Sequence, residues 1–435
     1  MRRALAGAGA LVSGALVVAL RLAAPAAATP GPTSAPEYWF DNWHVTQLWN
    51  SGALGQGITI AEIDTGVNAS LPELAGRVLS GKDFGPAGGN GQVDREVDAF
   101  GHGTAMASIM VGRPGIFGIT GLAPDARVLP IAVPLTGTTD SQPDDHLASA
   151  IRWAADHGAK VISMSLGGTR YPADGTQPCP ADEQQAVFHA LRKGAVLLAS
   201  AGNKGRSGSP VEEPGVCLGV LSVGAVDASG TVAGFSSRHP YLMMSAPGVN
   251  IASLSRVPGM AYSGDGTSQA TAIASAVLAL AWSRYPTDTG AQIVARLLDT
   301  LDRHRETRDP AYGYGIVDGY TAVTAPVPPS APNPVYAAAA PFLARDTAFL
   351  DPPKLRAPAV AATPGQHTGS FAVGSAPRLL VPDVLAGLGV ALAGLLALVA
   401  LVALGAAARV SRRRRPAAAE PAPAYPGADP GYPGG

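Results

Sequence analysis

The sequence predicts an α/β protein with a doubly wound, mostly parallel sheet flanked by helices, followed by one C-terminal transmembrane helix. The sheet is predicted because short apolar, β-rich segments alternate with helical patterns from residue 57 to residue 285. The membrane helix is predicted because the 25 residues from Val384 to Ala408 carry no charge.

The predicted strands and helices follow one another along the chain. The strands are expected at residues 57–63, 128–133, 160–164, 195–199 and 220–223. The helices are expected at residues 103–111, 146–157, 183–193 and 268–285, with a short amphipathic helix at 45–49. Doubly wound sheets bind ligands at the carboxyl ends of their strands, so functional side chains are expected there.

The N-terminus has the composition of a secretory signal peptide. Arg2 and Arg3 precede an apolar run at residues 4–20 and then the small residues Ala26 to Ala28. The alternative is a retained anchor. Arg21 disfavours it, because the apolar run ends before the roughly 20 residues that a membrane span needs.

The C-terminal apolar segment is predicted to cross the plasma membrane once. Arg409 and Arg412 to Arg415 follow it directly, and such basic clusters stay in the cytoplasm. A buried core helix is the alternative, but the Pro-rich flanks offer no protein to bury it. We therefore expect an extracytoplasmic α/β domain and a cytoplasmic C-terminus.

These features divide the chain into six predicted segments. They are a signal peptide (1–28), an N-terminal extension (29–48), the α/β domain (49–323), a Pro/Ala-rich linker (324–381), a transmembrane helix (382–408) and a basic, then disordered tail (409–435).

Charge and cysteine content narrow the class of protein. Charged residues make up 14% of the chain and the formal net charge is -1, so nucleic-acid binding is not expected. The two cysteines, Cys179 and Cys217, both lie in the part expected to be exported. An oxidising compartment favours a disulfide between them, with two free thiols as the alternative.

Four polar residues beside glycines are candidates for chemistry. Asp64 ends a predicted strand, His102 starts a helix between two glycines, Asn203 follows a strand, and Ser268 precedes an apolar helix. Ser268 would benefit from the positive end of that helix dipole. Taken singly, each has a structural alternative, as a turn residue, a core histidine or a helix N-cap.

Together these residues resemble the subtilases, the subtilisin-like serine peptidases. The matching segments are Asp64-Thr65-Gly66, His102-Gly103-Thr104, Ser165-Leu166-Gly167-Gly168, Ala201-Gly202-Asn203 and Gly266-Thr267-Ser268. The order Asp, His, Ser distinguishes this family from other proteases with the same triad. The resemblance covers residues 49–323 and implies an endopeptidase that hydrolyses protein or peptide substrates.

The resemblance also implies a role for each residue. Ser268 would attack the scissile carbonyl, His102 would transfer the proton, and Asp64 would orient the imidazole. Asn203 would stabilise the oxyanion together with the Ser268 N–H. The residues implied in pairing with extended substrate are Ser165, Leu166 and Gly167.

No cofactor and no metal ligand are expected. The acidic residues Asp94, Glu96 and Asp98 lack a recognisable ligand spacing and are interpreted as a solvated loop. Two features depart from the family. Gln269 and Ala272 stand where subtilases usually have an apolar residue and a proline, so altered activity is expected. Only about 20 to 30 residues separate the predicted signal peptide from the domain, so no large folding prodomain is expected.

The order of segments is similar to that of the mycosins, membrane-anchored subtilases associated with type VII secretion. That resemblance implies limited proteolysis near the membrane and association with a type VII secretion membrane complex. Two alternatives remain open: a structural subunit of such a complex with a subtilase fold and little turnover, and a surface protease unrelated to secretion.

Overall fold

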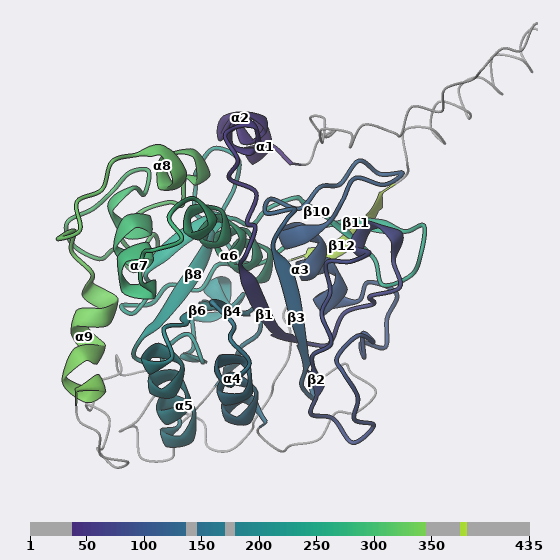
Figure 1. Cartoon of the computed structure of the whole chain (residues 1–435), viewed down its shortest axis with the longest axis horizontal. Helices are drawn as coiled ribbons and strands as arrows, with labels where there is room; N and C mark the ends of the chain where they lie inside the picture. Colours follow the sequence, from purple (N-terminus) through teal and green to yellow (C-terminus); the bar gives the residue numbers. More distant parts are fainter. Residues whose placement is uncertain (1–36, 136–145, 170–178, 345–374, 381–435) are drawn as a thin grey trace, which may run out of the picture. The chain divides into compact units, whose positions relative to one another are not determined.

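The computed structural model describes residues 37–135, 146–169, 179–344 and 375–380 (Figure 1). The chain divides into two compact units, Met1–Arg378 and Leu379–Gly435. The predicted signal peptide (1–28), transmembrane helix (382–408) and tail (409–435) lie outside the described residues. Within the described ranges, no helix combines the length and the apolar character needed to cross a membrane.

The first unit is built on a seven-stranded sheet with the order β2-β3-β1-β4-β6-β8-β9. Every neighbouring pair in this sheet is parallel, which confirms the predicted doubly wound arrangement. The strands are β1 (Thr59–Asp64), β2 (Lys82–Asp83), β3 (Arg127–Ala132), β4 (Val161–Met164), β6 (Val196–Ser200), β8 (Val220–Val226) and β9 (Met244–Pro247). The five strands predicted from apolar runs are all confirmed.

Helices cover both faces of the sheet. Helices α4 (Leu147–Asp156) and α5 (Ala181–Arg192) pack together over one apolar face, to which Ile63 and Met164 contribute. Helices α3 (His102–Val111) and α6 (Thr267–Arg284) contact each other, and α6 also contacts β4, β6, β8 and β9. Every residue from Thr267 to Trp282 is buried, so α6 is the central helix of the molecule.

Smaller elements complete the unit. Two further sheets have the orders β10-β11-β12 and β5-β7. Their strands are β5 (Gly168–Thr169), β7 (Glu212–Glu213), β10 (Ile251–Leu254), β11 (Ala261–Asp265) and β12 (Ser375–Leu380). Helices α7 (Gly290–Asp299) and α8 (Gly319–Thr324) follow α6, and short 3₁₀ turns lie at η1 (Pro72–Leu74) and η2 (Gly205–Ser207).

The N-terminal extension is docked on the domain by aromatic side chains. It forms α1 (Trp39–Asn42) and α2 (Val45–Asn50), which confirms the short helix predicted at 45–49. The Trp49 indole N–H donates to the Leu122 carbonyl at 3.0 Å. The ring of Trp43 packs against Gly319 of α8. A Cβ on Gly319 would lie 2.8 Å from Trp43 Cε3.

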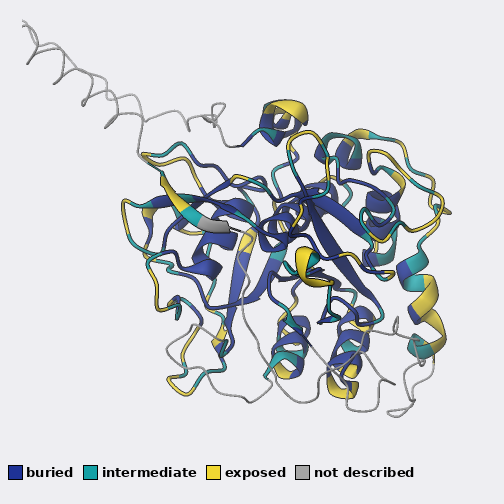
Figure 2. Ribbon diagram, turned by 180° about the vertical axis from the view of Figure 1, so that it is seen from behind, coloured by how far each residue is buried: buried dark blue, intermediate teal, exposed yellow. Residues whose placement is uncertain are grey.

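Part of the segment predicted as a linker (324–381) is a helix. Helix α9 (Pro334–Leu343) begins after Asn333, whose side chain accepts from the Tyr336 N–H. The buried side chain of Ala339 faces the domain, and Phe342 stacks on Phe188 of α5 with ring centroids 5.5 Å apart. Figure 2 shows the other face of this helix exposed to solvent. The alanine-rich composition of this segment favours a helix, and packing of Phe342 against Phe188 stabilises it.

The two cysteines form a disulfide. The Cys179 and Cys217 sulfurs are 2.05 Å apart and the Cα atoms are separated by 5.1 Å, which confirms the predicted pairing and excludes two free thiols. The bond joins the start of α5 to the segment before β8.

Candidate active site

Asp64 is the last residue of β1, the strand at which the order of strands along the sheet reverses. Strands β3 and β2 lie on one side of β1, and β4, β6, β8 and β9 lie on the other. Open α/β sheets bind ligands at the carboxyl ends of the strands beside such a switch point. The Asp64 side chain is fully buried there, and its Oδ1 accepts from the Thr65 N–H at 2.8 Å.

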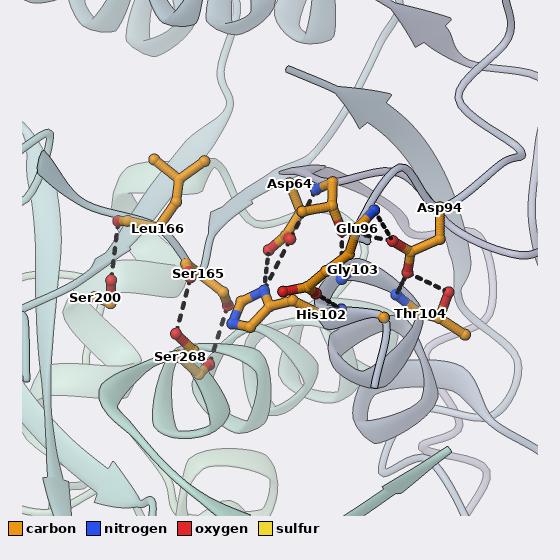
Figure 3. A network of polar contacts seen from close by, with 12 residues as sticks. Asp64, Asp94, Glu96, His102, Gly103, Thr104, Ser165, Leu166, Ser200 and Ser268 are labelled. Atoms are coloured by element: carbon orange, nitrogen blue, oxygen red, sulfur yellow. Dashed lines mark hydrogen bonds and ion pairs between the residues drawn. The ribbon is translucent and has the colours of Figure 1, made fainter. Parts of the chain in front are cut away.

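His102 is the first residue of α3 and lies against Asp64 (Figure 3). Its Nδ1 is 2.8 Å from Asp64 Oδ1 and 3.0 Å from Oδ2. A carboxylate in that position keeps the proton on Nδ1, so that Nε2 is the nitrogen able to accept a second one. Gly101 before it has φ = 68°, and a Cβ there would lie 2.4 Å from Arg256 Cβ, so only glycine fits this helix start.

The acidic loop before α3 is not the solvated loop that the sequence predicted. Asp94 is only 4% exposed, and its carboxylate accepts from Thr65 Oγ1, from the Thr104 N–H and Oγ1, and from the Glu96 N–H. The carboxylate of half-buried Glu96 accepts from the His102 backbone N–H. Asp98 alone of the three acidic residues is exposed.

The need for acceptors at the start of α3 explains this loop. The first N–H groups of a helix have no partner inside the helix, and Gly101 has no side chain to cap them. Asp94 and Glu96 supply the missing acceptors from upstream. A glycine at the start of a helix, preceded by several acids, was the signal in the sequence that could have revealed this role.

Electrostatics couple these carboxyl groups to the imidazole. Burial alone would lower the pKa of His102, but the carboxylates of Asp64, Glu96 and Asp94 outweigh burial and raise it to about 9. Burial is the main reason that the pKa of Glu96 rises to about 7, although the His102 charge opposes that rise. Burial also raises the pKa of Asp94, against the hydrogen bonds that it accepts.

Ser268 is the second residue of α6 and lies on the side of the imidazole opposite Asp64 (Figure 3). Its hydroxyl donates to the Ser165 carbonyl at 2.8 Å, and the Ser165 hydroxyl donates to the Ser268 carbonyl at 3.0 Å. This reciprocal pair ties the start of α6 to the end of β4. The Ser268 N–H belongs to the first turn of α6, where helix amides have no intrahelical acceptor.

Asn203 is fixed by its side-chain oxygen. Its Oδ1 accepts from the N–H and from the Oγ1 of Thr267, both at 2.9 Å. Because a donor N–H meets Oδ1, the amide orientation is settled and the NH₂ group points away from Thr267. The loop after β6 is thereby attached directly to the residue before Ser268.

The three residues predicted to bind substrate lie beside Ser268 but differ in what they expose. The Ser165 and Leu166 carbonyls accept from the Ser268 and Ser200 hydroxyls, the latter at 2.9 Å. The Leu166 side chain belongs to the apolar core, so only its backbone is available to a ligand. Gly167 is half-buried.

Sequence reasoning missed a buried polar cluster beside this segment. Glu212 is 3% exposed; its Oε1 accepts from Thr169 Oγ1 at 3.2 Å and lies 4.0 Å from Lys204 Nζ. A Cβ on Gly202 would lie 2.7 Å from Glu212 Cγ, and one on Gly167 would lie 3.6 Å from Oε2. Burial is the main cause that raises the pKa of Glu212 to about 7. The consecutive acids Glu212 and Glu213 were the available signal.

Among the described residues, one group of side chains has the spacing of metal ligands. The group there with ligand atoms close enough to share an ion is Cys179, Glu183 and Cys217. Both of its cysteines are in the disulfide.

Comparisons with known proteins agree with this geometry. The sequence profile of peptidase S8, the subtilase family, matches residues 55–315. Fervidolysin from Fervidobacterium pennivorans is 34% identical over 316 residues, which cover 65% of this chain and 42% of fervidolysin. Subtilisin E from Bacillus subtilis is 35% identical over 256 residues, which cover 58% of this chain and 62% of subtilisin E. The chain thus spans less than two thirds of the length of these relatives.

Solved structures give longer matches. The MycP3 protease from the type VII (ESX-3) secretion system is 32% identical with a TM-score of 0.58, covering 68% of this chain and 89% of that one. MycP1 from Mycobacterium smegmatis is 29% identical with a TM-score of 0.57, covering 69% and 90% of the two chains. Since the family profile matches more than half of the sequence, the chain belongs to the subtilase family.

Proposed function

We propose that this chain is a serine endopeptidase that hydrolyses peptide bonds through Asp64, His102 and Ser268. The observation that carries the proposal is the position of the imidazole, bonded to Asp64 through Nδ1 and flanked by Ser268 at the start of α6. The naming of its relatives as proteases supports the same activity.

The proposed reaction uses each group in turn. Ionised Asp64 holds the Nδ1 proton, so that His102 Nε2 takes the proton of the Ser268 hydroxyl as Oγ attacks the carbonyl. The Asn203 NH₂ and the Ser268 N–H stabilise the oxyanion. His102 then protonates the leaving amine, and a water molecule, activated in the same way, hydrolyses the acyl-enzyme.

The Ser268 hydroxyl must turn for this reaction. In the structure it donates to the Ser165 carbonyl, whereas proton transfer requires that it donate to His102 Nε2. Catalytic hydrogen bonds often tighten only when substrate is bound, so this geometry is compatible with activity. The backbone of Ser165, Leu166 and Gly167 pairs with the extended substrate as an added strand.

A fluorophosphonate probe tests the proposal. The wild-type chain should be labelled and Ser268→Ala should not, because the probe reacts only with an activated serine. Ser275→Ala, two turns further along the same helix, should be labelled like the wild type. If the folded wild-type chain is not labelled, the enzyme proposal is wrong.

The proposed location is the plasma membrane, with a single C-terminal span, the protease domain outside and the tail in the cytoplasm. Its support is the signal-like N-terminus and the uncharged segment before Arg409 in the sequence. Alkaline phosphatase, which is active only outside the cytoplasm, should be active when fused after residue 323 and inactive when fused after residue 435. The opposite result would exclude this topology.

Association with a type VII secretion membrane complex is the proposed context. It is supported by the likeness to the MycP3 and MycP1 proteases of type VII secretion systems. A strain lacking the chain should lose type VII export. Unaffected export would instead favour a surface protease unrelated to secretion.

A structural subunit with little turnover is the second candidate. Two observations favour it: the Ser268 hydroxyl donates to Ser165, and Gln269 replaces the usual apolar residue next to Ser268. Its side chain lies against the glycines before Ser268, where a Cβ on Gly266 would be 2.4 Å from Gln269 Oε1. Restoration of export by Ser268→Ala in the deletion strain would establish this role, and failure to restore it would favour proteolysis.

A further inference from the structure

Glu96 contacts His102 but is not one of the three residues proposed to carry out the reaction. It lies in the loop before α3, and its carboxylate accepts from the backbone N–H of His102 itself (Figure 3). Its side chain therefore caps the helix at the residue that carries the imidazole. Capping by a charged carboxylate also places a negative charge at the positive end of the helix dipole.

The loop that carries Glu96 is fixed at both ends. The Glu96 N–H donates to Asp94 Oδ1 at 3.1 Å, and the Asp94 carboxylate is anchored on Thr104 of α3. Beyond Glu96, the Arg256 N–H donates to the Phe100 carbonyl at 3.1 Å and Arg256 Nε donates to the Asp98 carbonyl at 2.5 Å. Glu96 is thus held against His102 by the fold around it.

The titratable and charged groups around His102 come from three elements. Strand β1 contributes Asp64 and, one pleat deeper, Glu62; the loop contributes Asp94, Glu96 and Asp98; and the turn after β10 contributes Arg256, packed against Gly101. Asp64, Glu96 and Asp94 raise the pKa of His102, in that order of effect, against the opposing effect of burial. Of these groups, Glu96 accepts from the backbone N–H of His102, whereas Asp64 bonds the ring nitrogen Nδ1.

We propose that Glu96 is a positioning residue for the catalytic imidazole: it caps the His102 N–H and holds a second carboxylate charge beside the ring. This inference rests on the proposed protease function. The charge favours the imidazolium, which cannot accept a proton from Ser268. Glu96 therefore raises the pH at which His102 becomes able to activate Ser268. The cap, in contrast, keeps the imidazole in place at every pH.

Glu96→Gln separates these two effects. The glutamine oxygen still accepts from the His102 N–H, but the charge is lost. Glu96→Ala removes both. Asp98→Asn is the matched control, because it neutralises a neighbouring acid whose Oδ1 accepts from the Phe100 N–H at 2.8 Å.

The first measurement is the rate of fluorophosphonate labelling of the full chain from pH 6 to pH 10. An opposite charge within about 4–6 Å of a titrating group typically shifts its pKa by about one to three units. The midpoint of the acid limb should therefore fall by about one unit in Glu96→Gln, which means about three- to fivefold faster labelling at pH 8, where wild-type Glu96 is ionised, with an unchanged plateau. Glu96→Ala should lower the plateau, and Asp98→Asn should behave like the wild type.

The second measurement is the NMR titration of His102 in histidine-labelled full-length chain carrying Ser268→Ala, which needs no activity. The His102 midpoint should be lower when Glu96→Gln is added. If the wild type is labelled but Glu96→Gln leaves both midpoints unchanged, the inference about Glu96 is wrong and the protease proposal stands. If the wild type is not labelled, the protease proposal fails, and the NMR midpoints still decide whether Glu96 controls His102.

Discussion

At the residue scale, the side-chain amide of Asn203 is held in one orientation by hydrogen bonds alone. Thr267 provides two donors to the same amide oxygen, so rotation of the amide would break both hydrogen bonds. The NH₂ group is thus preorganised beside the start of α6, where the oxyanion is expected. Preorganised donors of this kind act on the transition state more than on the bound substrate.

Asn203→Ala should lower kcat about 10²–10³-fold and leave KM nearly unchanged, because the oxyanion loses a donor. Hydrolysis kinetics on a chromogenic peptide would measure both constants. Asn90→Ala, which changes an exposed loop asparagine, is the control and should leave both constants unaltered. A loss confined to KM would show that Asn203 binds the ground state instead.

The surroundings of Glu62 determine whether its carboxyl group carries a charge. It lies two residues before Asp64 on β1 and is buried, and neither of its carboxyl oxygens makes a well-formed hydrogen bond in the described part of the chain, although the Ala107 backbone weakly favours its charged form. Burial, followed by the charges of Asp64 and Asp94, raises its pKa well above the usual value of 4.5. Burial thus favours the uncharged acid at Glu62, two residues before Asp64 on β1.

Glu62→Met should stabilise the chain by about 1 to 3 kcal/mol at pH 5, because an unpaired buried polar group costs that much. The gain should be larger at pH 8. Above pH 4.5 the unfolded chain releases the Glu62 proton while the folded chain retains it, so the wild type loses stability that the variant keeps. Urea denaturation in a Ser268→Ala background, which prevents self-digestion, measures both values.

The exposed residue Glu306 provides the control for this experiment, since Glu306→Met should change stability little at either pH. Destabilisation by Glu62→Met, or a gain that shrinks as the pH rises, would contradict the uncharged state assigned to Glu62.

At the scale of elements, the strands were predictable and the loops were not. Strands β1, β4, β6 and β8 are short apolar runs buried on both sides, and such runs are readable without any knowledge of tertiary contacts. The loop before α3 is polar, and its burial depends on Arg256, which lies more than 150 residues further along the chain. No local pattern carries that information.

The same distinction holds for the candidate site. Asp64, His102, Asn203 and Ser268 were singled out because each has glycines nearby and stands at the end of a strand or the start of a helix. Glu96 and Glu212 have no such setting. Their roles follow from contacts across the fold, with His102 for Glu96 and with Thr169 for Glu212.

Helix α3 depends on close approach to the turn after β1. A Cβ on Gly103 would lie 2.2 Å from the Gly66 carbonyl oxygen, although alanine is normally the better helix former. Gly103→Ala should therefore lower the free energy of unfolding by about 1 to 3 kcal/mol, as overpacking does. It should also slow fluorophosphonate labelling at least about tenfold, because displacement of α3 moves His102 away from Asp64.

Denaturant unfolding and labelling rates of the same preparation would measure both effects. Gly168→Ala is the control for stability, because its Cβ would meet no atom closer than 3.5 Å. Stabilisation by Gly103→Ala would mean that α3 and the Gly66 turn are not in the contact described.

On the scale of the whole molecule, the site joins parts of the chain that are far apart in sequence. The end of β1, the start of α3, the loop after β6 and the start of α6 meet at the carboxyl edge of one sheet. Burial there costs little for neutral groups but a great deal for charges. The charged groups at this edge therefore couple the stability of the whole chain to pH.

The folded chain should lose about 3 kcal/mol of stability between pH 6.5 and pH 9 through His102 alone. Its pKa is raised from 6.5 to about 9, so the folded chain keeps a proton that the unfolded chain releases across this window. The contribution is complete below pH 6.5 and is lost as the pH approaches 9. Glu96 and Glu212, with pKa values raised to about 7, act in the same direction at lower pH.

His239 acts in the opposite direction but outside this window, because burial lowers its pKa to about 4 and its effect is complete by pH 6.5. Urea denaturation of the Ser268→Ala chain at pH 6.5, 7.5 and 9 measures the loss. Adding His102→Gln should reduce the loss by about 3 kcal/mol, whereas adding His157→Gln, which removes a surface imidazole, should leave it unchanged. Stability that is constant or rises from pH 6.5 to 9 would show that the carboxylates around His102 do not hold it in the charged form.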